Sequence, residues 1–123
     1  MCSLTPLKVV SEWRRYVRIV AQAASRVVPN AELYLTGGVA EGRLTILSDV
    51  DILVVLPEKP GFDQAIDIRV RLLEEAERLG LPLYAPIEIH VIGEEELSRY
   101  AKKGKLVKLS KSGAEGYLSG RAP

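Results

Sequence analysis

The sequence predicts an α/β (α+β) fold in which a small mixed β-sheet is flanked by helices. Segments with apolar residues at helical spacing alternate with short apolar runs that glycine and proline bound. A chain of 123 residues with 47% hydrophobic and 27% charged residues has the size and composition of one ordinary globular domain. We expect a single domain over 1–123, with its core over about 5–100 and a basic tail over 102–123.

The first predicted element is a helix that begins at Thr5-Pro6, since a hydroxyl cap followed by proline is typical of a helix start. Pro29-Asn30 ends it. Its apolar residues recur at helical spacing and should face a core, whereas its arginines form the solvated face. These apolar residues are Val10, Trp13, Val17, Val20, Ala24 and Val27.

Two strands and a glycine turn follow. The first strand is predicted over 32–36 and leads into Gly37-Gly38, and the second spans 49–56 and ends at Pro57. Residues 39–47 between them are expected to hold a short helical turn.

The second half of the chain predicts a helix over 62–79, a strand over 87–92 and a short helix from Gly93 to about Tyr100. The middle helix has an apolar stripe of Phe62, Ile66, Val70, Leu73 and Ala76. We expect the helices to pack against one face of the sheet, and the tail after Lys102 to be frayed at its end.

Bulk properties exclude several classes of protein. The net charge of +1 gives no general attraction to nucleic acid or membranes, and no apolar run reaches the roughly 18–20 residues of a membrane span. No secretory signal is visible, and Cys2 alone cannot form a disulfide framework, so a cytoplasmic protein is expected. Abundant Arg, Lys and Glu with few Asn and Gln lean toward a thermophile.

Two carboxylates open the second strand, in Asp49-Val50-Asp51. Alternation along a strand places Asp49 and Asp51 on the same face, close enough to share a cation. Carboxylates beside a buried strand are costly unless a positive charge compensates them, and Mg²⁺ held by carboxylates and substrate phosphates would do so. Gly37 and Gly38 leave backbone N–H groups accessible to a phosphate.

A third acid, Glu88, lies in the strand Ile87 to Ile92. If this strand neighbours the Asp-x-Asp strand, the three acids can share one sheet face and bind two metal ions about 3.5–4 Å apart. Glu88 would then also be a candidate general base.

Simpler interpretations stay open for each residue. Ser48-Asp49 is common turn chemistry, and Glu88 can be a solvent-facing strand residue. His90 shares its face with Glu88, but a lone histidine is more often a polar edge residue. The lysines from Lys102 onward are more often a flexible polar tail than a nucleic-acid patch.

The combined pattern resembles a minimal nucleotidyltransferase (MNT) domain of the DNA polymerase β-like superfamily. In that family a Gly-Ser pair precedes an Asp-x-Asp pair by about ten residues, and a third acid lies on a later strand. Here Gly37-Gly38 and Asp49-Val50-Asp51 match the two pairs, and Glu88 within Ile-Glu-Ile matches the third acid. Ala40, Gly42 and Ser48 also fit, and the resemblance covers roughly residues 5–100.

The resemblance implies transfer of a nucleoside monophosphate, AMP from ATP by default, to an acceptor with Mg²⁺ or Mn²⁺. Asp49, Asp51 and Glu88 would be catalytic and would ligate metal, and Gly37, Gly38, Arg43 and Ser48 would contact the nucleotide. Two positions depart from the family pattern. Gly38 stands where serine is usual, and Glu41 stands where many relatives have a basic residue that Arg43 would replace.

The alternative function is a weakly active or inactive antitoxin-like subunit, because small members of the family often have a helical partner of the HEPN class. A homodimer or such a partner would complete the nucleotide cleft, with Trp13, Tyr84 or Tyr100 as anchors, although core packing is the simpler role for Trp13. Nucleic-acid polymerisation is the least expected activity. The sequence leaves the acceptor open: a protein side chain, a small molecule or a nucleic-acid end.

Overall fold

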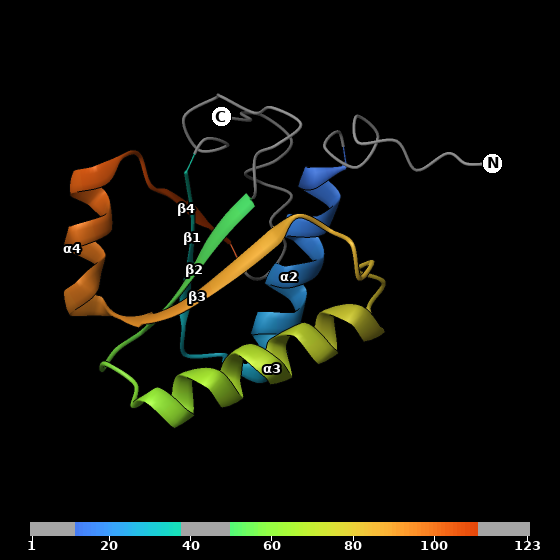
Figure 1. Cartoon of the computed structure of the whole chain (residues 1–123), viewed down its shortest axis with the longest axis horizontal. Coiled ribbons are helices and arrows are strands. Elements are labelled where there is room, and N and C mark those ends of the chain that lie inside the picture. The colour runs from blue at the N-terminus through green and yellow to red at the C-terminus, as the bar shows by residue number, and fades with distance from the viewer. Residues whose placement is uncertain (1–11, 38–49, 111–123) are drawn as a thin grey trace.

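A computed structural model of the chain describes residues 12–37 and 50–110 and confirms the predicted fold class (Figure 1). In chain order its elements are α2 (Trp13–Val27), β1 (Glu32–Thr36), β2 (Val50–Leu56), α3 (Phe62–Arg78), β3 (Ile87–Gly93), α4 (Glu94–Lys103) and β4 (Val107–Leu109). The predicted helix start at Thr5-Pro6 and the turn within 39–47 lie outside the described residues.

The four strands form one mixed sheet in the order β3-β2-β1-β4. Strand β1 is antiparallel to both β2 and β4, whereas β2 and β3 are parallel and are connected through α3. Parallel neighbours need such a crossover, because a tight hairpin can join only antiparallel strands. The starts of β2 and β3 therefore lie at the same end of the sheet as the end of β1.

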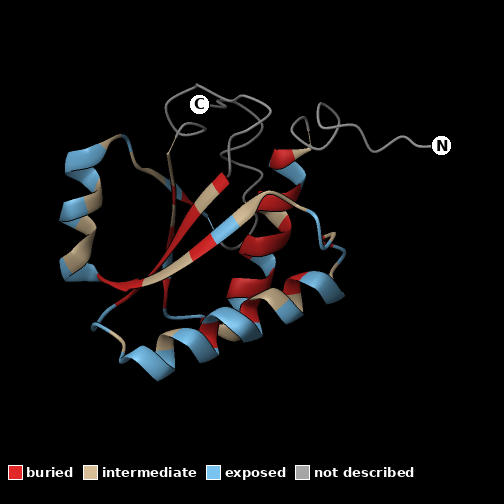
Figure 2. Cartoon of the chain, in the orientation of Figure 1, coloured by how far each residue is buried: buried red, intermediate tan, exposed pale blue. Residues whose placement is uncertain are grey.

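Helices α2 and α3 cover one face of this sheet, and the main core lies between them and the strands (Figure 2). Alternation along β2 directs Val50, Ile52 and Val54 into this core. Trp13 is buried in the same cluster, so the simpler interpretation of this residue is the correct one. The predicted stripe of the first helix is confirmed from Trp13 onward, because Val17, Val20 and Ala24 are also buried; Val27 is partly buried beside them.

The predicted stripe of the middle helix is wrong in its first half, at Phe62, Ile66 and Val70, and is confirmed at Leu73 and Ala76. Phe62, Ile66 and Val70 of α3 are exposed, by 81%, 46% and 47% respectively, and the helix instead buries Ile68, Leu72 and Ala76. Both sets have apolar residues at intervals of three or four, and both include Ala76, so periodicity alone cannot choose between them. The choice comes from tertiary packing, because α3 turns the second set toward α2 and the sheet.

The sequence predicts that all helices pack against one face of the sheet, and this prediction is wrong. Helix α4 lies on the opposite face, where it and the following segment cover a smaller apolar cluster. Its buried members are Leu53, Val55 and Ile92, and Tyr34, Leu97, Tyr100 and Leu106 pack against them.

The tail contains a strand that the sequence analysis did not predict. Strand β4, Val107–Leu109, pairs with β1 through Leu33↔Leu109 and Leu35↔Val107. Three residues are too few for a clear alternation pattern, and the surrounding lysines favoured a solvated tail. No helix in the described parts of the chain is long and apolar enough to cross a membrane.

Candidate active site

The carboxylates of Asp51 and Glu88 lie on neighbouring strands at one end of the sheet. Asp51 of β2 is paired with Glu88 of β3 on one side and with Thr36 of β1 on the other. Both acids are on the sheet face opposite α2 and α3, because the residues that alternate with them, Ile52 and Ile89, are in the main core. The predicted approach of Glu88 to the Asp-x-Asp strand is therefore correct.

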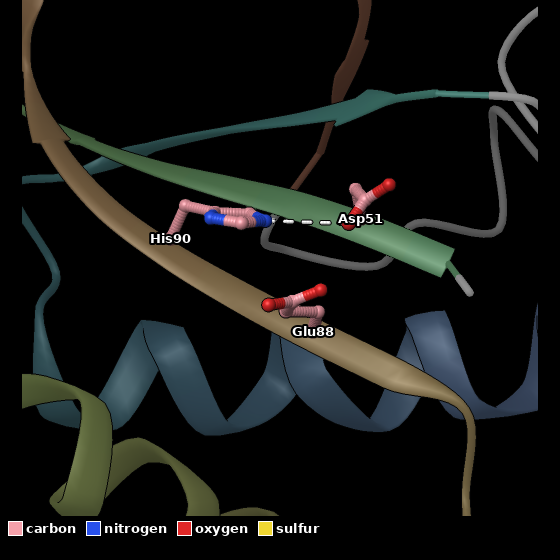
Figure 3. A group of neighbouring side chains, drawn as sticks. All are labelled: Asp51, Glu88 and His90. Carbon is pink, nitrogen blue, oxygen red and sulfur yellow. Dashed lines mark hydrogen bonds and ion pairs between the residues drawn. The ribbon is translucent and has the colours of Figure 1, made fainter.

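His90 joins these two acids from the same face of β3 (Figure 3). Its Nε2 lies 3.3 Å from Oδ1 of Asp51, within hydrogen-bonding distance. One ligand atom from each of Asp51, Glu88 and His90 can be chosen so that all lie within 4.8 Å of one another. A lone histidine in such a strand is expected at a polar edge, but the structure places His90 in the acidic cluster.

The hydrogen bond with Asp51 raises the pKa of His90 above its ordinary value. Partial burial and the charge of Arg69 act in the opposite direction, whereas the negative charges of Asp51 and Glu88 add to the increase. When protonated, the His90 imidazolium supplies part of the positive charge that the carboxylates need. Asp51 and His90 are 27% and 31% exposed, so the cluster remains accessible to a ligand.

Gly37 lies directly against the Asp51 carboxylate. Its φ of +86° is in the left-handed region, which residues other than glycine rarely adopt. A Cβ atom at this position would lie only 2.7 Å from Oδ2 of Asp51, which is closer than such atoms approach. Glycine is thus required both by the backbone turn after β1 and by the position of the carboxylate.

A cavity of about 330 Å³ opens beside this cluster. Residues of β1, β2 and β3 form one wall, and the end of α4 forms the other. The strand wall consists of Thr36, Gly37, Asp51 and His90, and the helix wall consists of Tyr100, Lys103 and Gly104. The cavity is therefore lined by Asp51, which could hold a cation together with the neighbouring Glu88, and by a lysine that could contact an anion.

The donor set of the cluster fits a divalent cation. Two carboxylates supply hard oxygen ligands, which suit Mg²⁺ and Mn²⁺, and the imidazole is an acceptable additional ligand for Mn²⁺. If Nε2 of His90 were to ligate the cation, its hydrogen bond with Asp51 would be lost, because a ligating ring nitrogen carries no proton and gives its lone pair to the metal.

Four residues predicted for the site lie outside the described residues: Gly38, Arg43, Ser48 and Asp49. Their roles stay predictions. The structure adds three residues that the sequence analysis did not assign to the site, namely His90, Tyr100 and Lys103. Alternation with Glu88 was the available signal for His90. For Tyr100 and Lys103 there was none, because their position depends on α4 folding back over the sheet face that contains the acids.

The chain is similar to known proteins in sequence and in fold. A family model described as a nucleotidyltransferase domain matches residues 17–111. The crystal structure of a proposed nucleotidyltransferase from Sulfolobus solfataricus is similar with a TM-score of 0.58, covering 89% of this chain and 90% of its own at 19% sequence identity. Another proposed nucleotidyltransferase of known structure is 26% identical, covering 80% of this chain and 99% of its own with a TM-score of 0.48.

No curated protein matches the sequence. The similarity to the Sulfolobus solfataricus structure shows the fold, and the family model spans most of the chain, including the strands that contribute Asp51 and Glu88. The chain therefore belongs to the nucleotidyltransferase domain family.

Proposed function

We propose that this domain transfers a nucleoside monophosphate from a nucleoside triphosphate to an acceptor, with a divalent cation bound at Asp51 and Glu88. The observation that supports this proposal is the convergence of Asp51, Glu88 and His90 beside a cavity that Gly37 also lines. ATP and Mg²⁺ or Mn²⁺ are the proposed substrate and cofactor. Asp49, two residues before Asp51, is the proposed third carboxylate of the site.

The proposed reaction forms one bond and breaks one. An acceptor hydroxyl oxygen attacks the α-phosphorus, the bond from that phosphorus to the bridging oxygen of pyrophosphate breaks, and pyrophosphate leaves with the bonding electron pair. When bound, the divalent cation offsets the negative charge of the triphosphate and of the leaving group. Glu88 is exposed and accepts the hydroxyl proton as general base.

The other described residues of the site orient these groups. His90 holds the Asp51 carboxylate through their hydrogen bond until a cation is bound. Gly37 allows the chain after β1 to pass close to Asp51, so that a phosphate can approach the backbone as well as the cation. The acceptor is left open by this geometry, because the exposed position of Glu88 admits a hydroxyl from a small molecule, a protein or a nucleic-acid end.

Removal of the Asp51 charge tests the proposal. Asp51→Asn keeps the size of the side chain and removes its charge, so we expect Mn²⁺ affinity to fall by an order of magnitude or more, on the scale on which losses around metal sites are measured. Calorimetry with Mn²⁺, followed by titration of ATP in the presence and absence of the cation, measures this change. Release of pyrophosphate from ATP then reports the transfer itself.

Asp67→Asn is a matched control, because Asp67 is an exposed aspartate of α3 that pairs with Arg71 outside the cavity. This control should bind Mn²⁺ and ATP like the wild type. The proposal is wrong if Asp51→Asn and the wild type bind the cation and ATP equally well.

A further inference from the structure

Lys103 faces the acidic strands from the opposite wall of the cavity. It is the last residue of α4 and the only lysine or arginine among the described residues that line this cavity. Its ammonium lies 5.8 Å from the centre of the Tyr100 ring, near enough for attraction by the face of the ring. The centre of the Tyr100 ring is in turn 6.3 Å from the centre of the His90 ring, so these two side chains are neighbours.

Within the described parts of the chain, Lys103 forms no salt bridge, although several other cations do. Lys108 pairs with Glu32, and Arg26 and Arg78 both pair with Glu75. Lys103 lines the same cavity as the Asp51 carboxylate and forms no salt bridge with it, so its charge is available for a ligand. The Tyr100 ring supports the ammonium in that position without neutralising it.

We infer that Lys103 binds the β- and γ-phosphates of the triphosphate and so makes the site selective for polyphosphates over monophosphates; this inference rests on the proposed function. Asp51 and Glu88 repel a triphosphate unless a cation is bound beside them. The far end of the triphosphate, which becomes pyrophosphate, needs a positive group of its own. Lysine is a common phosphate ligand and acts there as a point charge.

Lys103 also has a simpler possible role, which is to stabilise the end of α4. Basic residues in the last turn of a helix interact favourably with the helix dipole, and α4 ends with both Lys102 and Lys103. The two lysines share the helix turn, the charge and solvent exposure, but only Lys103 lines the cavity. Lys102 is therefore the matched control for every property except the proposed contact.

The test compares Lys103→Gln with Lys102→Gln in the full chain. Affinity for inorganic tripolyphosphate, ATP and AMP is measured by calorimetry at a fixed Mn²⁺ concentration. Because Lys103 is exposed, we expect Lys103→Gln to weaken tripolyphosphate and ATP binding by about ten-fold at low ionic strength, and by less at high salt. Mn²⁺ and AMP affinity should stay unchanged, and Lys102→Gln should behave like the wild type.

The outcomes separate this inference from the proposed function. Lys103-dependent binding of tripolyphosphate, together with equal Mn²⁺ and ATP affinity in Asp51→Asn and the wild type, supports the inference and contradicts the proposed function. Wild-type release of pyrophosphate with equal polyphosphate affinity in Lys103→Gln overturns the inference and leaves the transfer in place. Equal losses in the two lysine variants, an equal loss for AMP, or no binding of tripolyphosphate by the wild type would each overturn the inference as well.

Discussion

The two faces of the sheet are built for different purposes. The face under α2 and α3 is closed by interlocking apolar side chains, and strand residues such as Leu33, Ile52 and Val54 have no exposed surface there. The opposite face has a small apolar cluster beneath α4, and beside it lie Asp51, Glu88 and His90 next to an open cavity. The same strands supply both faces, because successive side chains point in opposite directions.

The difference shows how a small domain combines stability with a polar site. Burial of apolar surface on the closed face supplies the stabilisation that the charged groups on the open face reduce. Each strand side chain points either into the core or toward the site. Substitutions on the core face should therefore change stability, and substitutions on the site face should change ligand affinity. The expected effects on stability fall from the closed core, through the turn beside the site, to the surface charges between the helices.

Leu72→Ala should have the largest effect on stability. Leu72 has no exposed surface in the core between α3 and the sheet, and removal of a buried leucine side chain to alanine costs about 2–5 kcal/mol. Urea unfolding measures this loss, and the Mn²⁺ affinity of the protein that remains folded should not change. A parallel loss of Mn²⁺ affinity would show that the two faces are coupled and would contradict the separation of purposes.

Gly37→Ala should affect both properties. The positive φ costs about 1–2 kcal/mol for a residue with a Cβ atom, and the 2.7 Å approach displaces the Asp51 carboxylate. We expect lower stability together with weaker Mn²⁺ binding, measured by urea unfolding and calorimetry. Gly61→Ala is the control, because its φ is −69° and no atom lies within 4 Å of the new Cβ. If Gly37→Ala bound Mn²⁺ with wild-type affinity, Gly37 would have no role in cation binding.

Glu75→Gln should have the smallest effect, and that effect should depend on pH. Hydrogen bonds from Arg78 and Arg26 lower the pKa of Glu75 to about 2 from an ordinary value of 4.5. A depressed pKa means that the carboxylate stabilises the folded protein above about pH 4.5, and that this contribution disappears as the pH falls toward 2. The Tm of Glu75→Gln should therefore be lower than that of the wild type at pH 7 and equal to it near pH 2.

A difference in Tm that stays constant from pH 7 to pH 2 would show that Glu75 acts by packing rather than by charge. Arg71→Gln is a suitable comparison, since its partner Asp67 is exposed on the same helix and no second element is involved. Loss of that pair should change the Tm less than loss of Glu75, which joins α3 to α2 through Arg26 at 2.7 Å.

Much of the fold could be predicted because each element has its own local pattern. The strand over 32–36 and the beginning of the helix at Phe62 were predicted to the residue. The buried side of α3 could not be predicted, because Ile66 and Leu72 belong to two apolar stripes that both recur at helical spacing. Strand β4 is three residues long, and its pairing depends on β1, which lies far away in the sequence.

For the site, alternation along each strand predicts that Asp51 and Glu88 lie on one sheet face if their strands are neighbours. The structure shows that the strands are neighbours and that the two acids are paired. The position of Tyr100 and Lys103 of α4 at the cavity could not be predicted, because no local sequence pattern indicates which face of a sheet a short helix covers. The roles of Asp49 and of the residues around Gly38 stay predictions, as does association with a second copy or a helical partner.

The pairing of β4 with β1 has a consequence for the order of folding. Lys108 and Glu32, which are paired by a contact of 3.4 Å, are separated by 76 positions in the chain. Closing so long a loop costs entropy that later contacts must recover, and such contacts form slowly. On the ribosome β4 is also the last described element to be synthesised. The end of α4, which forms the second wall of the cavity, lies just before β4 in the chain, after both helices of the closed face. These two helices can therefore dock while the second wall of the cavity is still incomplete.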